Sequence, residues 1–104
     1  MNKSETEYLI LRKLEENPRL TQREISKELG VSLGKTNYVI NALIDKGLLK
    51  LDNFKRSDKK LGYIYLLTPR GITEKTTLAQ NFLKRKSEEY NKLKIEIEIL
   101  KNEL

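Results

Sequence analysis

Apolar side chains recur three or four residues apart over the first 47 residues, which is the spacing of one face of a helix. Tyr8, Leu11 and Leu14 lie on one side of a first predicted helix. Ser4 and Glu7 have the spacing of a capping box, so this helix is expected to start there and to run to about residue 16. Pro18 disfavours helical backbone in the residue before it and ends the helix.

Two further helices are predicted on either side of a tight turn. Thr21 and Glu24 form a capping box for the second helix. Gly30 stands where a residue in the left-handed conformation would end it. Ser32 is the expected N-cap of the third helix, which Gly47 stops. The apolar stripe of this third helix consists of Thr36, Ile40, Leu43 and Ile44.

The opposite face of the third helix is polar and carries groups that can donate and accept hydrogen bonds. Its residues are Lys35, Asn37, Tyr38 and Asn41. A helix-turn-helix presents such a face to the major groove of DNA. Two capped helices with a turn also occur in many proteins that never touch nucleic acid, so the segments that follow must decide between the two interpretations.

After the third helix, the pattern changes to one that favours strands. Residues 48–54 and 62–67 predict two strands, and residues 55–60 between them contain no apolar side chain. A β-hairpin directly after a helix-turn-helix is a wing. Its tip holds four positive charges and one negative charge. We expect the tip to contact the DNA backbone or the minor groove, the alternative being a merely solvated loop.

Thr68 and Pro69 start a last helix, because threonine is a good N-cap and proline is tolerated at the first helical position. The heptad a and d positions that follow are apolar except at Thr76 and Lys86, which predicts a dimeric coiled coil. The expected dimerisation residues, here called the seam, are Ile72, Ala79, Leu83, Tyr90, Leu93, Ile97, Leu100 and Leu104.

Charges beside the seam favour a parallel pair of helices. In a parallel dimer Glu89 would meet Lys94 of the second chain. Glu96 would meet Lys101 in the same way. An antiparallel pair would instead set like charges together. The alternative for the whole segment is a solvated single helix with ion pairs inside it.

Ile95 and Ile99 fall outside the seam, at heptad positions f and c, where exposed side chains are expected. The seam does not explain them. They would be accounted for by a higher-order assembly, such as a four-helix one, or by packing against a winged domain.

Composition narrows the classes of function. The net charge of +6 favours a polyanionic partner, nucleic acid first and an anionic membrane second. Without cysteine or histidine, neither disulfides nor a usual zinc site can form, and the commonest catalytic side chains are missing. We expect no enzyme, no cofactor and no metal. No apolar run could span a bilayer and no signal-peptide pattern is present, which predicts a cytoplasmic protein without a membrane partner.

The segment from Gly30 to Thr36 is similar to a phosphate-binding loop. However, three residues rather than four separate its glycines, and it follows a predicted helix rather than a strand. We therefore do not expect an ATPase or GTPase.

These segments together predict a mainly α fold with a small β-hairpin. Residues 1–68 are expected to form a winged helix-turn-helix DNA-binding domain, and residues 69–104 a long C-terminal helix that dimerises as a coiled coil. The basic charge belongs to the first part, since residues 1–71 carry +5 and residues 72–104 carry +1.

The order of these elements, with VSLGKTNYVINALIDKGLLK across the third helix and LTPRGI after the wing, resembles the MarR-type winged helix-turn-helix regulators. The size and the Lys-rich last helix resemble the short subgroup associated with exopolysaccharide gene clusters. The resemblance implies a homodimer on a pseudo-palindromic operator in double-stranded DNA, which occludes or adjusts transcription of nearby genes. A repressor is expected, with an activator as the alternative.

The resemblance also assigns roles to residues. The base-reading helix would use Gly34, Lys35, Asn37, Tyr38 and Asn41, with Ser32 and nearby backbone amides on a phosphate. The wing would use Lys55, Arg56, Lys59 and Lys60. Larger members dimerise through both terminal helices and often bind a small ligand between the dimer interface and the DNA-binding part. The short N-terminus here departs from that pattern, so neither feature is carried over, and any small-molecule effector is unknown.

The rival hypothesis is a winged helix that binds protein or RNA, with the last helix as a coiled-coil scaffold. Lys and Arg on the groove-facing side argue against a purely protein-binding surface. Salt titration with duplex DNA separates the two, because counterion release makes DNA binding steeply salt-dependent.

Overall fold

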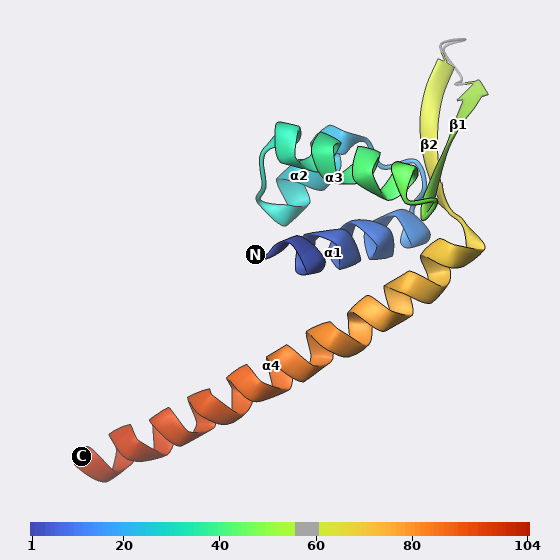
Figure 1. Cartoon of the computed structure of the whole chain (residues 1–104). Coiled ribbons are helices and arrows are strands. Elements are labelled where there is room, and N and C mark those ends of the chain that lie inside the picture. Colours follow the sequence, from blue (N-terminus) through green and yellow to red (C-terminus); the bar gives the residue numbers. More distant parts are fainter. Residues whose placement is uncertain (56–60) are drawn as a thin grey trace.

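A computed structural model describes residues 1–55 and 61–104, with the side chains at 54, 55, 61 and 62 outside the description. The predicted fold class is confirmed: the chain is mainly helical, with one two-stranded antiparallel hairpin and a long last helix (Figure 1). The elements are α1 (Lys3–Glu16), α2 (Gln22–Leu29), α3 (Leu33–Asp45), β1 (Leu49–Lys55), β2 (Leu61–Leu67) and α4 (Pro69–Glu103).

The start of α1 differs from the sequence prediction. Its N-cap is Asn2, whose side-chain oxygen accepts a hydrogen bond from the backbone amide of Glu5 at 2.9 Å. Ser4 therefore lies inside the helix, and Glu7 is largely buried and pairs with Lys46 instead of closing a capping box. Asparagine is as good an N-cap as serine, and here the helix takes the earlier one.

One hydrophobic core joins α1, α2, α3 and the base of the hairpin. Residues 3–67 are here called the lobe. Among the side chains that the structure describes, the lobe supplies all but one of the completely or nearly buried apolar ones. Val39 belongs to this core, although the predicted stripe of α3 omitted it. The core consists of Ile10, Leu11, Leu14, Ile25, Val39, Ile40, Leu43, Leu48, Leu49, Tyr65 and Leu78.

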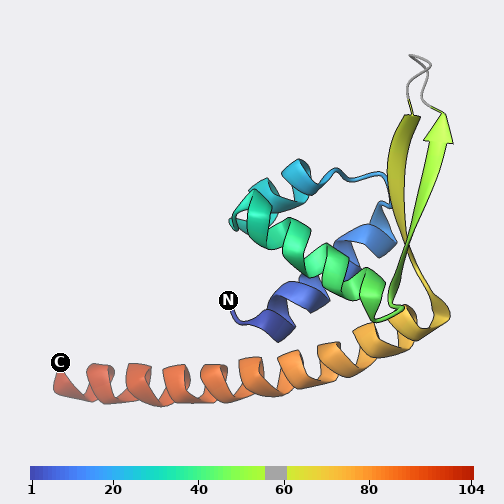
Figure 2. The same ribbon diagram turned by 45° about the horizontal axis from the view of Figure 1, so that its top comes forward.

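The hairpin is buried at its base and projects away from helices α1 to α3 (Figure 2). Leu49 pairs with Leu67 and Leu51 pairs with Tyr65 in the antiparallel register. Leu49 is 2% exposed, whereas Leu51, on the same face two residues further out, is 45% exposed. The face of β1 that carries both leucines is therefore buried only at the base of the hairpin.

The helix α4 packs on α1 in the antiparallel direction along its first half and then leaves the lobe (Figures 1 and 2). Tyr8 stacks on Phe82 with ring centroids 5.4 Å apart, and Leu78 is 7% exposed. Ion pairs of Glu15 with Lys75 and of Glu5 with Arg85 flank this contact.

Candidate nucleic-acid interface

The helix pair α2 and α3 begins and ends where the sequence predicts. The Thr21 hydroxyl accepts from the amide of Glu24 at 3.1 Å, and the Glu24 carboxylate accepts from the amide of Thr21 at 3.2 Å, which is a complete capping box. Gly30 has φ 68°, the left-handed conformation that ends α2. The Ser32 hydroxyl accepts from the amide of Lys35 at 3.0 Å and caps α3.

A buried hydrogen bond fixes the angle between the two helices. The Ser26 hydroxyl on α2 and the Thr36 hydroxyl on α3 lie 2.8 Å apart. The Thr36 hydroxyl donates to the carbonyl of Ser32 at 3.1 Å. The single Ser26 proton is shared between the Thr36 oxygen and the carbonyl of Gln22, each at 2.8 Å. Thr36 was predicted as part of the apolar stripe; it is indeed fully buried, and its hydroxyl is satisfied there.

The polar face of α3 is exposed, as predicted. Tyr38 is 68% exposed, and Gly34, Lys35, Asn37 and Asn41 are exposed as well. A Cβ atom added at Gly34 would meet no atom within 4 Å, so nothing in the chain itself requires glycine there. Ser32 lies at the start of the same face, with its oxygen occupied by the cap.

Two residues that the sequence analysis did not select hold the polar face in place. Gln22, the first residue of α2, donates to the hydroxyl of Tyr65 on β2 at 3.0 Å. Its carbonyl oxygen accepts from the amide nitrogen of Asn37 at 3.1 Å, and the Asn37 oxygen accepts from Asn41 at 3.2 Å. We call these four residues the polar row. Because Gln22 and Tyr65 are 43 positions apart, no local pattern could have joined them.

The wing stands beside α3 in Figure 2, and the backbone register of its two strands runs out to the pair of Lys55 and Leu61. The predicted wing contacts do not lie within the described part of the molecule. Arg56, Lys59 and Lys60 fall among residues 56–60, and only the backbone of Lys55 is described.

Seam side chains along α4 are exposed, apart from Ala79, which is half-buried. The face that packs on α1 instead holds residues at heptad positions c and g, namely Leu78, Phe82 and Arg85 with their neighbours. On α4 the packed face lies next to the seam. The helix therefore packs on the lobe and leaves the seam uncovered. Each described residue from 86 to 104, a segment called the α4 tail, is exposed.

Charged side chains of the α4 tail pair within the helix in the single chain. Lys86 lies 3.2 Å from Glu89, and Lys101 lies 3.9 Å from Glu98. Ion pairs as exposed as these contribute little to stability.

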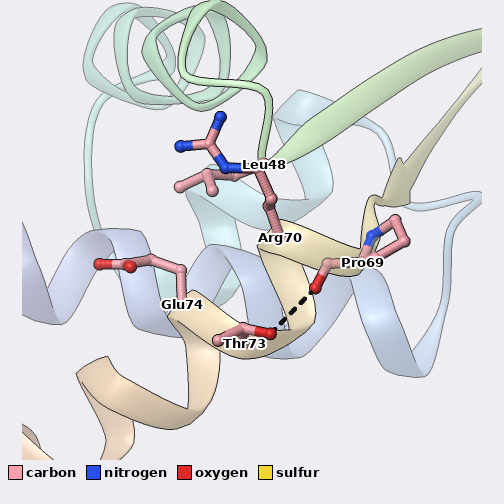
Figure 3. A pocket seen from close by; sticks show the side chains of 5 residues that line it. All are labelled: Leu48, Pro69, Arg70, Thr73 and Glu74. Carbon is pink, nitrogen blue, oxygen red and sulfur yellow. Dashed lines mark hydrogen bonds between the residues drawn. The ribbon is translucent and has the colours of Figure 1, made fainter.

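A pocket of about 310 Å³ lies where the lobe meets the start of α4. It is lined by Leu48, Pro69, Arg70, Thr73 and Glu74 (Figure 3). The Thr73 hydroxyl donates to the carbonyl of Pro69 at 3.2 Å, so that group is satisfied inside the helix. The lining offers one cation and one carboxylate around an otherwise small apolar surface.

Within residues 1–55 and 61–104, no three carboxylates gather in a way that could hold a metal ion. Among the described helices, none combines the length and the hydropathy needed to cross a bilayer.

A family model described as winged helix-turn-helix DNA-binding matches residues 3–50, which span α1 to the start of β1. The predicted resemblance to MarR-type regulators is thereby confirmed at the level of the fold: the chain has a winged helix-turn-helix domain, and its structural neighbours include regulators of the MarR and PadR types. The narrower resemblance to the exopolysaccharide-associated subgroup stays a prediction. No curated protein matches the chain in sequence.

Three solved structures show how far this similarity extends. A PadR-like transcriptional regulator from Bacillus cereus has a TM-score of 0.73 at 18% identity, with 84% of this chain and 89% of that chain covered. A MarR/EmrR family regulator from Acinetobacter sp. ADP1 has a TM-score of 0.62 at 21% identity, covering 94% and 73%. The MarR protein of Staphylococcus aureus, in complex with salicylate and kanamycin, has a TM-score of 0.57 at 22% identity, covering 83% and 56%. The chain thus spans little more than half of that last protein.

Proposed function

We propose that this protein is a transcriptional regulator that binds double-stranded DNA sequence-specifically, as a homodimer on a pseudo-palindromic operator in the cytoplasm. It acts by occupying the operator, as a repressor does, and carries out no catalytic step. The observation that carries the proposal is the exposed polar face of α3, held at a fixed angle on a capped α2. A recognition helix needs such a face to enter the major groove.

Each exposed group on α3 suits a different part of DNA. Lys35 can donate to guanine O6 and N7, and an asparagine amide can pair with adenine N6 and N7. Tyr38 can bond a phosphate or lie against a thymine methyl group. The open space around Gly34 lets the helix backbone approach the duplex closely. Ser32 and the first amides of α3 would bind a phosphate.

The wing residues Lys55, Arg56, Lys59 and Lys60 would contact phosphates beside the groove that holds α3. Such contacts raise affinity for every duplex and make it depend on salt, but they do not read sequence. Residues 1–68 would therefore form the DNA-binding domain.

Residues 69–104 would form the dimerisation element. The exposed apolar side chains of the seam support this assignment, because contiguous apolar surface of this kind is costly to leave in water. A parallel pair would set Glu89 against Lys94 and Glu96 against Lys101 of the second chain. It would also place both lobes at the same end of the coiled coil, where two half-sites of one duplex can be reached.

The proposal is tested by selecting bound duplexes from a random pool with the purified protein. We expect an enriched sequence with two half-sites whose centres lie about 10 bp, or a multiple of that, apart. Affinity for it should fall steeply with added salt. Enrichment of no duplex, or equal binding to heparin and to the best duplex, would contradict the proposal and favour a protein- or RNA-binding role.

Two variants then separate base reading from backbone binding. Lys35→Ala should relax the preference at one base pair, while Lys59→Ala combined with Lys60→Ala should weaken binding to all duplexes alike. An equal loss on specific and random duplexes for Lys35→Ala would argue against its base-reading role.

A further inference from the structure

The polar row links the wing to the outer face of α3. It runs from the Tyr65 hydroxyl on β2, through the Gln22 side chain on α2, to Asn37 and then Asn41 on α3. Resting on the proposed function, we infer that Gln22 and Tyr65 are positioning residues that set Asn41 to read one base pair in each half-site. Neither residue needs to touch that base pair itself.

The inner end of the row is firmly anchored. Tyr65 is 8% exposed, and its backbone amide donates to the carbonyl of Pro18 at 3.2 Å, just before α2. Gln22 directly follows the N-cap Thr21, whose capping box fixes the backbone there. The hydrogen bond between Gln22 and Tyr65 is partly buried, so water competes for it less than for a bond on the surface.

Along the row, the hydrogen-bonding capacity of each amide indicates which asparagine is the reader. Asn37 is engaged at both ends, since its nitrogen donates to Gln22 and its oxygen accepts from Asn41. It keeps one N–H and one lone pair, but turning toward a base would break its bonds within the row. Asn41 uses one N–H, which leaves a second N–H and, among the described contacts, both lone pairs of its oxygen for a ligand. A free donor beside a free acceptor is what adenine N7 and N6 require. The structure therefore assigns base reading to Asn41 and an intermediate role to Asn37.

The polar row should act by restricting the rotamers of Asn41 before DNA binds. A lone asparagine on a helix surface loses rotamer freedom when it pairs with a base, and that loss weakens binding. Asn41 is already restrained by Asn37, so less freedom is lost on the correct base pair. Duplexes that Asn41 does not contact gain nothing from the restraint. Breaking the row should therefore reduce discrimination at one base pair by about 2- to 10-fold, the equivalent of ordering one side chain.

The experiment uses the full chain and the duplex enriched from the random pool, together with a panel in which each base pair is changed in turn. Gln22→Met keeps the length of the side chain but can neither donate nor accept strongly. Tyr65→Phe keeps the ring in the core and removes only the hydroxyl. Gln80→Met, on the exposed surface of α4, is the matched control. Thermal unfolding of each variant checks the fold.

Asn41→Ala first locates its base pair, by a loss of discrimination of about 5- to 100-fold at one position of each half-site. We expect Gln22→Met and Tyr65→Phe to reduce discrimination at that same position and to leave affinity for a random duplex unchanged. Gln80→Met should match the wild type. In the Asn41→Ala background, Gln22→Met should have no further effect, because the reader is gone.

The inference fails by itself if the wild type discriminates between duplexes but both row variants discriminate equally well at every position. It also fails if Gln22→Met weakens all duplexes alike, which would mean that Gln22 binds the backbone. If the wild type shows no preference for any duplex, the proposed function fails and the inference fails with it.

Discussion

The lobe and the α4 tail differ in the exposure of their apolar side chains. In the lobe, Ile10, Ile25 and Ile40 are completely buried. In the tail, Ile97 is 43% exposed and Tyr90 is 65% exposed, although the seam pattern is unbroken from Tyr90 onward. The apolar side chains of the lobe therefore bury one another, together with Leu78 of α4, whereas the apolar stripe of the tail is covered by no described residue of the chain. Under the proposed function, the tail is the part of the chain that a second copy would cover.

The largest effect is expected from a charge placed in the seam. Ile97→Asp would put one carboxylate from each chain into the dimer contact, and an uncompensated buried charge costs about 3–5 kcal/mol. We predict dimer dissociation at concentrations more than 100-fold higher than for the wild type, measured by sedimentation equilibrium. The melting of the lobe at high protein concentration should change much less.

Ile99→Asp is the matched control for that substitution, because position 99 lies outside the seam and is 54% exposed. It should leave the dimer intact. Dissociation by Ile99→Asp but not by Ile97→Asp would mean that the helices meet through the other face.

A core substitution gives the next largest effect and sharpens the contrast between the regions. Ile40→Ala leaves a cavity in the lobe and should lower the free energy of unfolding by about 2–5 kcal/mol. Ile99→Ala, the same chemical change in the tail, should lower it by less than about 0.5 kcal/mol. Both values come from urea unfolding at equal protein concentration. A loss at Ile99 as large as that at Ile40 would show that the second apolar face of the tail is buried in the assembly.

The contact between the lobe and the start of α4 should not tolerate an added methyl group. A Cβ atom at Gly71 would lie 2.1 Å from the backbone oxygen of Leu48, so Gly71→Ala must move α4 away from the lobe. We predict a loss of about 1–3 kcal/mol in unfolding free energy, as for other overpacked sites, despite the better helix propensity of alanine.

Gly34→Ala is the control for this contact, since a Cβ atom there meets nothing within 4 Å. It should keep or slightly raise the stability of the lobe. Under the proposed function it should weaken DNA binding, because the backbone of α3 could no longer approach as closely. An unchanged melting temperature for Gly71→Ala would refute the tight contact with Leu48.

The smallest effect is expected from the charges that orient the tail. Glu89→Lys would set two lysines together in a parallel dimer and weaken it by about 0.3–0.5 kcal/mol per contact. Adding Lys94→Glu should restore the original affinity. Sedimentation at low ionic strength measures the difference, and tighter dimers for the single variant would indicate an antiparallel pair.

Local signals in the sequence predict much of this fold. Thr21 with Glu24, Gly30, and Thr68 with Pro69 each act within a few residues, so helix ends could be placed without knowing the tertiary structure. The predicted start of α1 was wrong because Asn2 and Ser4 are both good N-caps, and the sequence alone does not say which one the helix uses.

Contacts between distant segments could not be derived in this way. Phe82 packs on Tyr8 because of the way α4 crosses α1, which heptad spacing does not specify. The bond from Gln22 to Tyr65 likewise depends on where β2 returns to the lobe. The polar face of α3 could be predicted from its own helical spacing, but its supporting residues could not.

The central claim is that the α4 tail is incomplete without a second copy of the chain. Sedimentation equilibrium of the 104-residue chain across a wide concentration range tests it most directly. The account predicts a mass of twice the 12.2 kDa of one chain, with dissociation only on dilution. A mass of 12.2 kDa at every concentration would contradict it, since the apolar stripe of the tail would then stay in water.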